Sequence, residues 1–553
     1  MTSPFDLPEM LLYIARFVDH KDLLACVRVC RQWKESFTPH IWTTVIVPEA
    51  WESSPAFPPL DLLQKNARFV RELTLQTSQG LSSFLENCSS LKTLVVYGKH
   101  VIEPQPGLWV ELTDLIRRNP LLEWIVLGFD RTSGPSASFL QALPEACPNL
   151  KRYESSRGKY NDPAQVEALM RAFSHMSTVS TRYEEFANSP QFKQWTFPRL
   201  YELTLKDAKG VCTQSQVDFV SRCPNLRHLK WSLCRETMMP VQEFCERVPT
   251  ACPLLCQLQM DGCGLPDPDD VGRLVDSLSR LELLSLCGNR ITNRTFSSLG
   301  RHFGTLQSLD VIDCFYVKSW MVQQILENCP NLIKLAMPVL RMRDIVQGKD
   351  WAAVRLRHLQ VNLVQTLSTT MKSVEVEEQW TTFERLSKLT QLRHLAVGSR
   401  SWTRREGLIF RMDCGVDQLK TLTKLRVLDL GHSCQRMEET DVAWITTHLE
   451  NLIKVEGVFY PDAQRHEELA RRMRLLGMDV PVADVPETFF DNPVLSDWED
   501  DDEEDDEDEY EDEYDYAYEE YEEGEETEVG TIPVPQGSNV PNAGVEIEDA
   551  GTH

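Results

Sequence analysis

One short apolar pattern returns along most of this 553-residue chain and limits its possible folds more than any other feature. The pattern is L-x-x-L-x-L, with Val, Ile, Met, Tyr or Trp also allowed at the apolar places. Clear copies start at Val70, Leu91, Leu122, Leu200, Leu226, Leu255, Leu281, Leu306, Leu332, Leu356, Leu392 and Leu425, and weaker copies start at Leu150 and Leu452. The chain is too long for one compact core, so we expect an array of repeats that grows in one dimension.

The spacing of the copies identifies the kind of repeat. Between Leu226 and Leu356 the copies are separated by 29, 26, 25, 26 and 24 residues, which falls in the range of about 20 to 29 residues of leucine-rich repeats. Helix-like segments that end in a polar or Cys-Pro break, such as residues 319–332, lie between the copies. The stretch from Leu281 to Leu335 resembles the cysteine-containing leucine-rich repeats that accompany F-boxes. The predicted fold class is therefore α/β, with a leucine-rich repeat solenoid, or horseshoe, over residues 70–480.

Two parts of the array are less regular. The gap from Leu150 to Leu200 is 50 residues long, which allows either one degenerate coil or a loop excursion over residues 151–199. At the other end we expect a helix near Ala463 to Leu476 to seal the last coil. Glu467 with Arg471 and Glu468 with Arg472 would form favourable i, i+4 pairs on that helix.

Eight of the sixteen cysteines follow the repeats rather than a metal or disulfide pattern. There is no Cys-x-x-Cys pair. Five cysteines lie three residues before a repeat start and three lie eight residues after one: Cys88, Cys147, Cys223, Cys252 and Cys329, and Cys234, Cys263 and Cys314. We expect these thiols to be buried at coil corners as packing residues. A reduced compartment, cytoplasmic or nuclear, is the expected location.

The N-terminal residues 7–42 are dense in apolar residues at helical spacing and predict three short helices. Pro8 suits a first helical position, because its missing N–H would be unpaired there anyway. Asp19 can cap the second helix. About forty residues bury little surface alone, so we expect another surface to cover this module.

The same residues carry a specific resemblance. Leu7-Pro8-Glu9, Leu11, Ile14, Asp22-Leu23, Val27, Val29-Cys30, Trp33 and Trp42 match the F-box pattern in order and spacing. The resemblance implies docking onto the Skp adaptor of a cullin-RING ubiquitin ligase, through Leu7, Pro8, Glu9, Leu11, Ile14, Leu23, Val27 and Trp33. The alternative is a helical cap that shields the open end of the repeat core. The expected division is an F-box-like domain at 1–45, a linker at 46–69, the array at 70–480 and a tail at 481–553.

Charge is concentrated in the tail. The net charge is −27, but residues 497–528 hold 23 Asp and Glu without any Lys or Arg, and residues 529–553 add three acids. Removing these 26 from the total of 84 acids leaves 58 against 57 bases in residues 1–496. The nearly neutral body argues against nucleic-acid binding. The tail is expected to be disordered. It can serve solubility, occupy basic protein surfaces or carry phosphorylated tyrosines, and composition does not choose among these roles.

Several classes of function are not expected. No run of about 18 apolar residues and no basic leader is present, so no membrane span and no export is predicted. Glycine-rich phosphate loops, a Walker lysine, His-Glu-x-x-His and Gly-x-Ser-x-Gly are absent from the sequence. We therefore expect no catalytic residues, no cofactor and no metal. The histidines of three L-R-H-L copies, His228, His358 and His394, are interpreted as exposed strand residues.

The expected target site is the inner, concave face of the solenoid. Side chains alternate along a strand, so residues two, four and six places after the first Leu of a copy point away from the core. This predicts a target-binding row made of His228, Lys230, Gln257, Gln259, Asp261, Ser308, Asp310, His358, Gln360 and Asn362. The predicted function is substrate recognition in an SCF-type ubiquitin ligase, with an unidentified protein target. The alternative is a non-catalytic scaffold in which the module is only a cap and the acidic tail binds basic partners.

Overall fold

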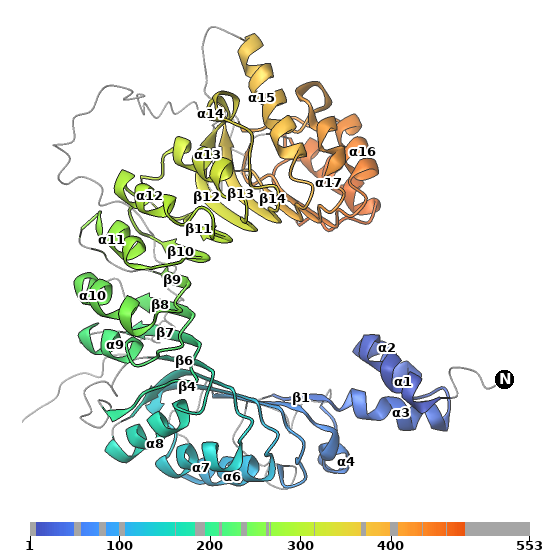
Figure 1. Ribbon diagram of the computed structural model, residues 1–553. Coiled ribbons are helices and arrows are strands. Elements are labelled where there is room, and N and C mark those ends of the chain that lie inside the picture. Colours follow the sequence, from blue (N-terminus) through green and yellow to red (C-terminus); the bar gives the residue numbers. More distant parts are fainter. Residues whose placement is uncertain are drawn as a thin grey trace, which may run out of the picture. The chain divides into compact units, whose positions relative to one another are not determined.

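The computed structural model describes most of the chain before the acidic segment, and shows one long parallel sheet with helices between its strands (Figure 1). The described residues are 7–48, 57–76, 85–98, 106–160, 162–182, 194–208, 213–233, 240–261, 265, 267–314, 316–365, 372–398, 407–433, 435–460 and 462–481. Within them the sheet has 16 strands, β1 to β16, which lie beside one another in the order of the sequence. This mixed α/β arrangement is compatible with a solenoid. The expected tail at 481–553 lies, except for its first residue, outside the described residues.

The N-terminal module consists of α1 (Pro8–Ile14), the short 3-10 helix η2 (Ala15–Phe17), α2 (His20–Cys26) and α3 (Arg31–Ile41). Pro8 is the first residue of α1, as the sequence predicted. Asp19 occupies the N-cap position of α2, but its side chain makes no capping hydrogen bond there. Leu11, Ala15, Leu23 and Phe37 form a small core of their own. The module therefore packs its helices around a core separate from that of the sheet.

The strands follow the repeat pattern closely. In each predicted copy a strand begins two residues after the first apolar residue of the copy. The 16 strands are β1 (Thr44–Val47), β2 (Glu72–Leu75), β3 (Thr93–Gly98), β4 (Trp124–Ser133), β5 (Arg152–Lys159), β6 (Thr178–Arg182), β7 (Glu202–Ala208), β8 (His228–Leu233), β9 (Gln257–Asp261), β10 (Leu283–Cys287), β11 (Ser308–Asp310), β12 (Lys334–Arg341), β13 (His358–Val364), β14 (His394–Ala396), β15 (Val427–Asp429) and β16 (Lys454–Glu456). Every neighbouring pair is parallel, so the connection between two strands must cross over.

Two strands were not predicted. β1 pairs with β2, so the sheet begins at Thr44 and not at residue 70. β6 pairs with β5 and β7, which shows that the long gap after Leu150 holds a degenerate coil. Both segments keep apolar residues at the right spacing but lack leucine. Residues 46–69, expected to be a linker, contribute part of β1, the helix α4 (Leu60–Asn66) and the fully buried Leu63.

Helices connect most successive strands and pack along one side of the sheet (Figure 1). They are α4, given above, and α6 (Pro106–Arg118), α7 (Ala137–Ala146), α8 (Pro163–Phe173), α9 (Thr213–Val220), α10 (Val241–Ala251), α11 (Asp270–Ser277), α12 (Asn293–Gly300), α13 (Ser319–Asn328), α14 (Met342–Gln347), α15 (Lys372–Ser387) and α16 (Glu439–His448). A last helix, α17 (Ala463–Leu475), follows β16. The core lies between this helical layer and the sheet. Aligned apolar residues of neighbouring strands, such as Leu229, Leu258 and Leu284, are buried there.

Buried polar side chains join neighbouring coils. Gln323 of α13 accepts a hydrogen bond from the indole N–H of Trp351 at 3.0 Å and donates one to the carbonyl oxygen of Lys349 at 3.2 Å. Both Gln323 and Trp351 are buried. Because a buried polar group without a partner is costly, such bonds fix how one coil sits on the next.

The C-terminal end is sealed by α17, as expected from the sequence. After this helix, Asp479 continues the sheet edge: its N–H donates to Ile453 O at 2.8 Å, and its carbonyl accepts from Val455 N at 3.0 Å. The predicted i, i+4 ion pairs are wrong. Glu467 instead pairs with Arg474, and Glu468 pairs with Arg465, because these side chains lie within reach in the folded helix. In the part of the chain that is described, no helix is long and apolar enough to cross a membrane.

Candidate interaction surfaces

The helical module carries a group of large apolar side chains that remain exposed. They lie directly before α1, on α1, η2 and α2, and in the turn after α2: Leu7, Met10, Leu12, Tyr13, Phe17, Leu24 and Val29. Phe17 is 73% exposed and its ring lies edge-on to that of Tyr13, with 5.1 Å between the centroids. So many large exposed apolar side chains on so small a module favour a role in binding another protein.

The predicted adaptor-binding residues separate into two groups in the structure. Leu7, Pro8 and Glu9 are exposed. Leu11 and Leu23 are buried in the module's own core, and Ile14, Val27 and Trp33 pack against it. These five hold the helices together in the isolated chain, so their effect on a partner would act largely through the fold of the module.

Sequence reasoning missed most of the exposed group. Met10, Leu12, Tyr13, Phe17, Leu24 and Val29 were not among the predicted contacts. The available signal was that α1 is apolar on both sides, with Leu11, Leu12, Tyr13 and Ile14 in succession. A short helix that is apolar all round needs a cover on each side.

The second surface is the open face of the sheet, which we define as the face carrying the second and fourth residues after the first apolar residue of each copy. The register aligns His228 with Gln257 and Lys230 with Gln259 on β8 and β9. Ser308 of β11 and His358 of β13 continue the first row, separated by Lys334 of β12. The predicted residues of these two rows therefore share one face and are half-buried or exposed, while the leucines between them are buried.

The register also adds residues that the predicted row omitted. Leu283 lies between Gln257 and Ser308, and Lys334 lies between Ser308 and His358. His394 follows His358 on β14. All three stand two places after the start of a copy, so the repeat pattern contained the signal.

The predicted third positions are less uniform. Asp261 pairs with Ser232 in the register of β8 and β9. Asn362 pairs with Val339 beyond a register shift in β12, so it is displaced by one residue relative to the regular rows. Asp310 and Gln360 lie in the regular second row, on either side of Ala336.

Charged and polar side chains contact one another at several places on the open face. Lys334 Nζ lies 2.7 Å from Asp310 Oδ2. His228 Nδ1 lies 3.8 Å from Glu202 Oε1. On β5, the Arg152 guanidinium lies over the Trp124 ring at 4.6 Å from its centroid. The face therefore offers mixed polar chemistry rather than one sign of charge.

The two histidines of β13 and β14 lie together on this face, with 6.2 Å between their ring centroids. Partial burial lowers the pKa of His358, and the neighbouring His394, Lys334, Arg393 and Arg357 lower it further. Partial burial also lowers the pKa of His394, although Asp429 and Glu456 act in the opposite direction. Both imidazoles are therefore favoured in their neutral form at neutral pH.

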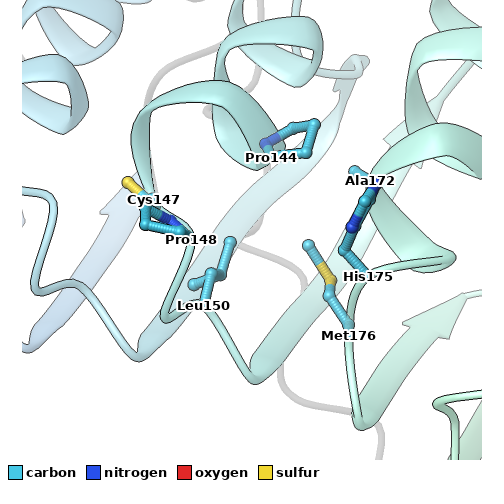
Figure 2. Close-up of a pocket in the computed structure, with 7 residues that line it drawn as sticks. All are labelled: Pro144, Cys147, Pro148, Leu150, Ala172, His175 and Met176. Atoms are coloured by element: carbon cyan, nitrogen blue, oxygen red, sulfur yellow. The ribbon is translucent and has the colours of Figure 1, made fainter.

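A small pocket lies at a coil corner, away from these surfaces. Figure 2 shows its lining from the end of α7 and the end of α8: Pro144, Cys147, Pro148, Leu150, Ala172, His175 and Met176. Its volume of about 20 Å³ is room for roughly one water molecule. Ligand pockets usually have several hundred Å³, so this one does not indicate a small-molecule site.

Of the eight cysteines predicted to be packing residues, the six that the structure describes are buried. Cys88, Cys147, Cys223, Cys252, Cys314 and Cys329 are free thiols and buried. Burial raises the pKa of Cys88, Cys147, Cys252 and Cys329 to about 12, so these thiols stay protonated. Cys234 and Cys263 lie outside the described residues. No group of three or more His, Cys, Asp or Glu that could hold a metal is found among the residues described.

Comparison with known proteins identifies the N-terminal module. The family model for F-box-like domains matches residues 7–47. No curated protein matches the sequence. Among solved structures, a chain of the crystal structure titled "Crystal structure of Rad7 and Elc1 complex in yeast" is similar at 12% identity and a TM-score of 0.36. That alignment covers 57% of this chain and 85% of the other.

Proposed function

We propose that this protein, whose residues 7–47 are an F-box-like domain, is a substrate-recognition subunit of an SCF-type ubiquitin ligase. The F-box-like domain binds a Skp-type adaptor, and through it a cullin-RING ligase. The sheet and its helices form a leucine-rich repeat solenoid that binds the target protein. The protein has no catalytic residues and needs no cofactor, since ubiquitin transfer is performed by other subunits.

The observation that carries this proposal is the exposed apolar group on the F-box-like domain. Phe17 and Val29 are 73% and 62% exposed on a module whose own core holds only four fully buried residues. Covering one large apolar side chain contributes about 1.5–3 kcal/mol. An adaptor that covers several of them would stabilise a domain that is small by itself.

In this proposal the protein acts by holding the adaptor and the target at two different surfaces. The adaptor is held at the N-terminal module, and the target is held on the open face by residues such as Lys230, Gln259 and His358. Free, buried thiols in the described residues support a location in a reduced compartment, the cytoplasm or the nucleus.

One observation favours a second candidate, a scaffold in which the module is only a cap. Trp42, at the end of α3, packs against the main core, and the chain then enters β1 directly. This continuity is what a cap on the first coil requires. In that case the acidic tail would be the element that binds basic partners.

Binding of a purified Skp-type adaptor to the full chain discriminates between the two candidates. We expect a stable complex with the native chain. The double variant Phe17→Ala with Val29→Ala should weaken it by at least tenfold, because two buried apolar contacts are lost. The double variant Leu7→Ala with Pro8→Ala should also weaken binding, and Trp33→Ala should do so together with loss of the module's helices.

The matched control is Val110→Ala. Val110 is also apolar and 62% exposed, but it lies on α6. Its variant should bind the adaptor normally. The proposed docking surface would be rejected if the native chain does not bind the adaptor. It would also be rejected if the Phe17 and Val29 variant binds the adaptor as tightly as the control does. In either case the scaffold, with the module as a cap, would be the remaining candidate.

A further inference from the structure

Three arginines lie at the same place in neighbouring coils, directly before the strands β13, β14 and β15. We call them the arginine ladder: Arg357, Arg393 and Arg426. Each is the second residue of its repeat copy. The backbone N–H of Arg393 donates to Arg357 O at 2.8 Å, and that of Arg426 donates to Arg393 O at 2.8 Å. Adjacent strands lie about 4.8 Å apart, so the three side chains leave the backbone at that interval. All three are exposed.

The ladder has no carboxylate of its own. Within the described residues, none of the three guanidinium groups forms an ion pair or a side-chain hydrogen bond. The residues at the same repeat position in the flanking coils are Ile333 and Ile453, which carry no charge. The ladder is therefore a row of three cations between two apolar ends.

The neighbouring row of the open face does not offset this charge. It contains Lys334, His358, His394, Val427 and Lys454 across β12 to β16. The two lysines are paired with Asp310 and Glu456, and the next acid along these strands is Asp429. The charged groups that act on His358 are all basic, and they include Arg357 and Arg393.

The same repeat position in the N-terminal coils shows what such a row can hold. There the row reads Lys92, Glu123 and Lys151 on consecutive coils. Glu123 lies between the two lysines, with Oε1 at 3.6 Å from Lys92 Nζ and Oε2 at 3.3 Å from Lys151 Nζ. The Lys151 and Lys92 ammonium groups hold the pKa of Glu123 below its usual range. One carboxylate is thus shared by cations that lie on two different coils.

We propose that the arginine ladder binds an acidic, Asp- or Glu-rich segment of the target protein. Ligand carboxylates would lie between neighbouring guanidinium groups, as Glu123 lies between Lys92 and Lys151. Arginine suits this role, because its planar fork of N–H donors matches both oxygens of a carboxylate. The inference rests on the proposed function, since it names the partner chemistry of the same repeat array.

The test measures peptide binding to the full chain and, in the same preparations, adaptor binding. The probe is a short fluorescein-labelled peptide of alternating Glu and Gly, and the matched probe replaces Glu by Gln. We expect the Glu peptide to bind and the Gln peptide not to bind, as followed by fluorescence anisotropy. Binding should fall steeply with salt, since the screening length shrinks from about 10 Å at 0.1 M to about 3 Å at 1 M.

Substitutions then assign the site. Arg393→Glu should weaken the Glu peptide by at least about tenfold, and Arg393→Lys should weaken it less, because the charge stays while the fork is lost. The matched control is Arg71→Glu, an exposed arginine at the same repeat position before β2. It should bind the peptide normally, and all three variants should bind the adaptor.

Four results would overturn the inference. The first two are equal binding of the Gln peptide and no effect of Arg393→Glu. The third is binding of a phosphoserine-Gly peptide where the Glu peptide does not bind. The fourth is binding of the Glu peptide only after the acids of residues 501–509 are replaced by amides, because the occupant would then be this chain's own segment. Failure of the proposed function is separable from these. It would show as loss of adaptor binding by a native chain that still binds the Glu peptide.

Discussion

Replacing Asn119 by Leu tests whether buried side-chain bonds hold one coil on the next. Asn119 directly follows α6 and is fully buried, and its side-chain amide makes three hydrogen bonds. Its amide donates to Cys88 O at 2.9 Å and to Leu115 O at 2.8 Å, and its oxygen accepts from Leu91 N at 2.8 Å. Leucine fills the space but leaves the Leu91 N–H and the Cys88 carbonyl without partners.

The expected cost follows from these two groups. An unsatisfied buried group costs about 1–3 kcal/mol, so two cost about 2–6 kcal/mol. The added apolar burial returns about 1–2 kcal/mol. At the midpoints of these two ranges, the free energy of local opening should fall by about 2.5 kcal/mol. Since about 1.4 kcal/mol corresponds to a factor of ten, amide exchange should be faster by roughly 60-fold.

Hydrogen exchange with mass spectrometry measures this effect segment by segment. Residues 85–98 should lose protection, whereas residues 425–430 should not change, because each repeat contacts only its neighbours. The control is Asn225→Leu, which removes one exposed bond to Pro198 O at 2.7 Å and should change stability by no more than about 0.5 kcal/mol. Unchanged exchange around Leu91 in the Asn119 variant would refute the reasoning.

Three further predictions follow from the open face, the tail and one buried histidine. The double variant Lys230→Glu with Gln257→Ala should abolish target capture while adaptor binding and the thermal transition stay normal. The target site would instead lie on loops if this variant still captures the target, but shortening the segment between Leu150 and Leu200 abolishes capture. Removing residues 497–553 should leave the thermal transition nearly unchanged, because so acidic a segment has little apolar surface to pack, and a fall of many degrees would contradict this. His466 accepts a hydrogen bond from Phe459 N at 3.2 Å, and burial lowers its pKa below 6.5, so the unfolded chain takes up a proton that the folded chain resists. Stability should therefore be retained above about pH 6.5 and decrease as the pH falls below it, and urea titrations of His466→Asn should show a weaker decrease than the native chain.

The strands could be predicted from sequence because their signal is local. Each L-x-x-L-x-L copy buries its leucines on one side, and the period of two fixes which residues face outward. β6 was missed because its copy, which begins at Met176, places Thr at the last apolar position. The copy that begins at Trp42 does fit the pattern, but Trp42 was assigned to the N-terminal helical module, so β1 was missed. The core accepts these residues, as Val45, Val179 and Thr181 are buried.

The contact surface of the N-terminal module could not be derived in the same way. α1 is apolar on both sides, so its sequence does not tell which side faces α3. In the structure Leu11 and Ala15 turn to Phe37, which leaves Leu12 and Phe17 outside. The family pattern emphasises residues that build the domain as well as those that are exposed, and only the packing of three helices separates the two roles.

The charge of the open face, and of the row of residues beside it, is set at a still longer range. Lys151 pairs with Glu123, 28 residues away, and Lys334 pairs with Asp310, 24 residues away. Whether a basic residue is neutralised therefore depends on the residues of the neighbouring coil, either at the same place in the repeat or in the adjacent row. Arg357, Arg393 and Arg426 follow one another without an acid between them, so their charges add, whereas Lys92 and Lys151 share Glu123. Residues 1–496 can therefore have a net charge near zero while the local charge differs from coil to coil. This difference would let an acidic segment bind at the coils of Arg357, Arg393 and Arg426 rather than at the N-terminal coils.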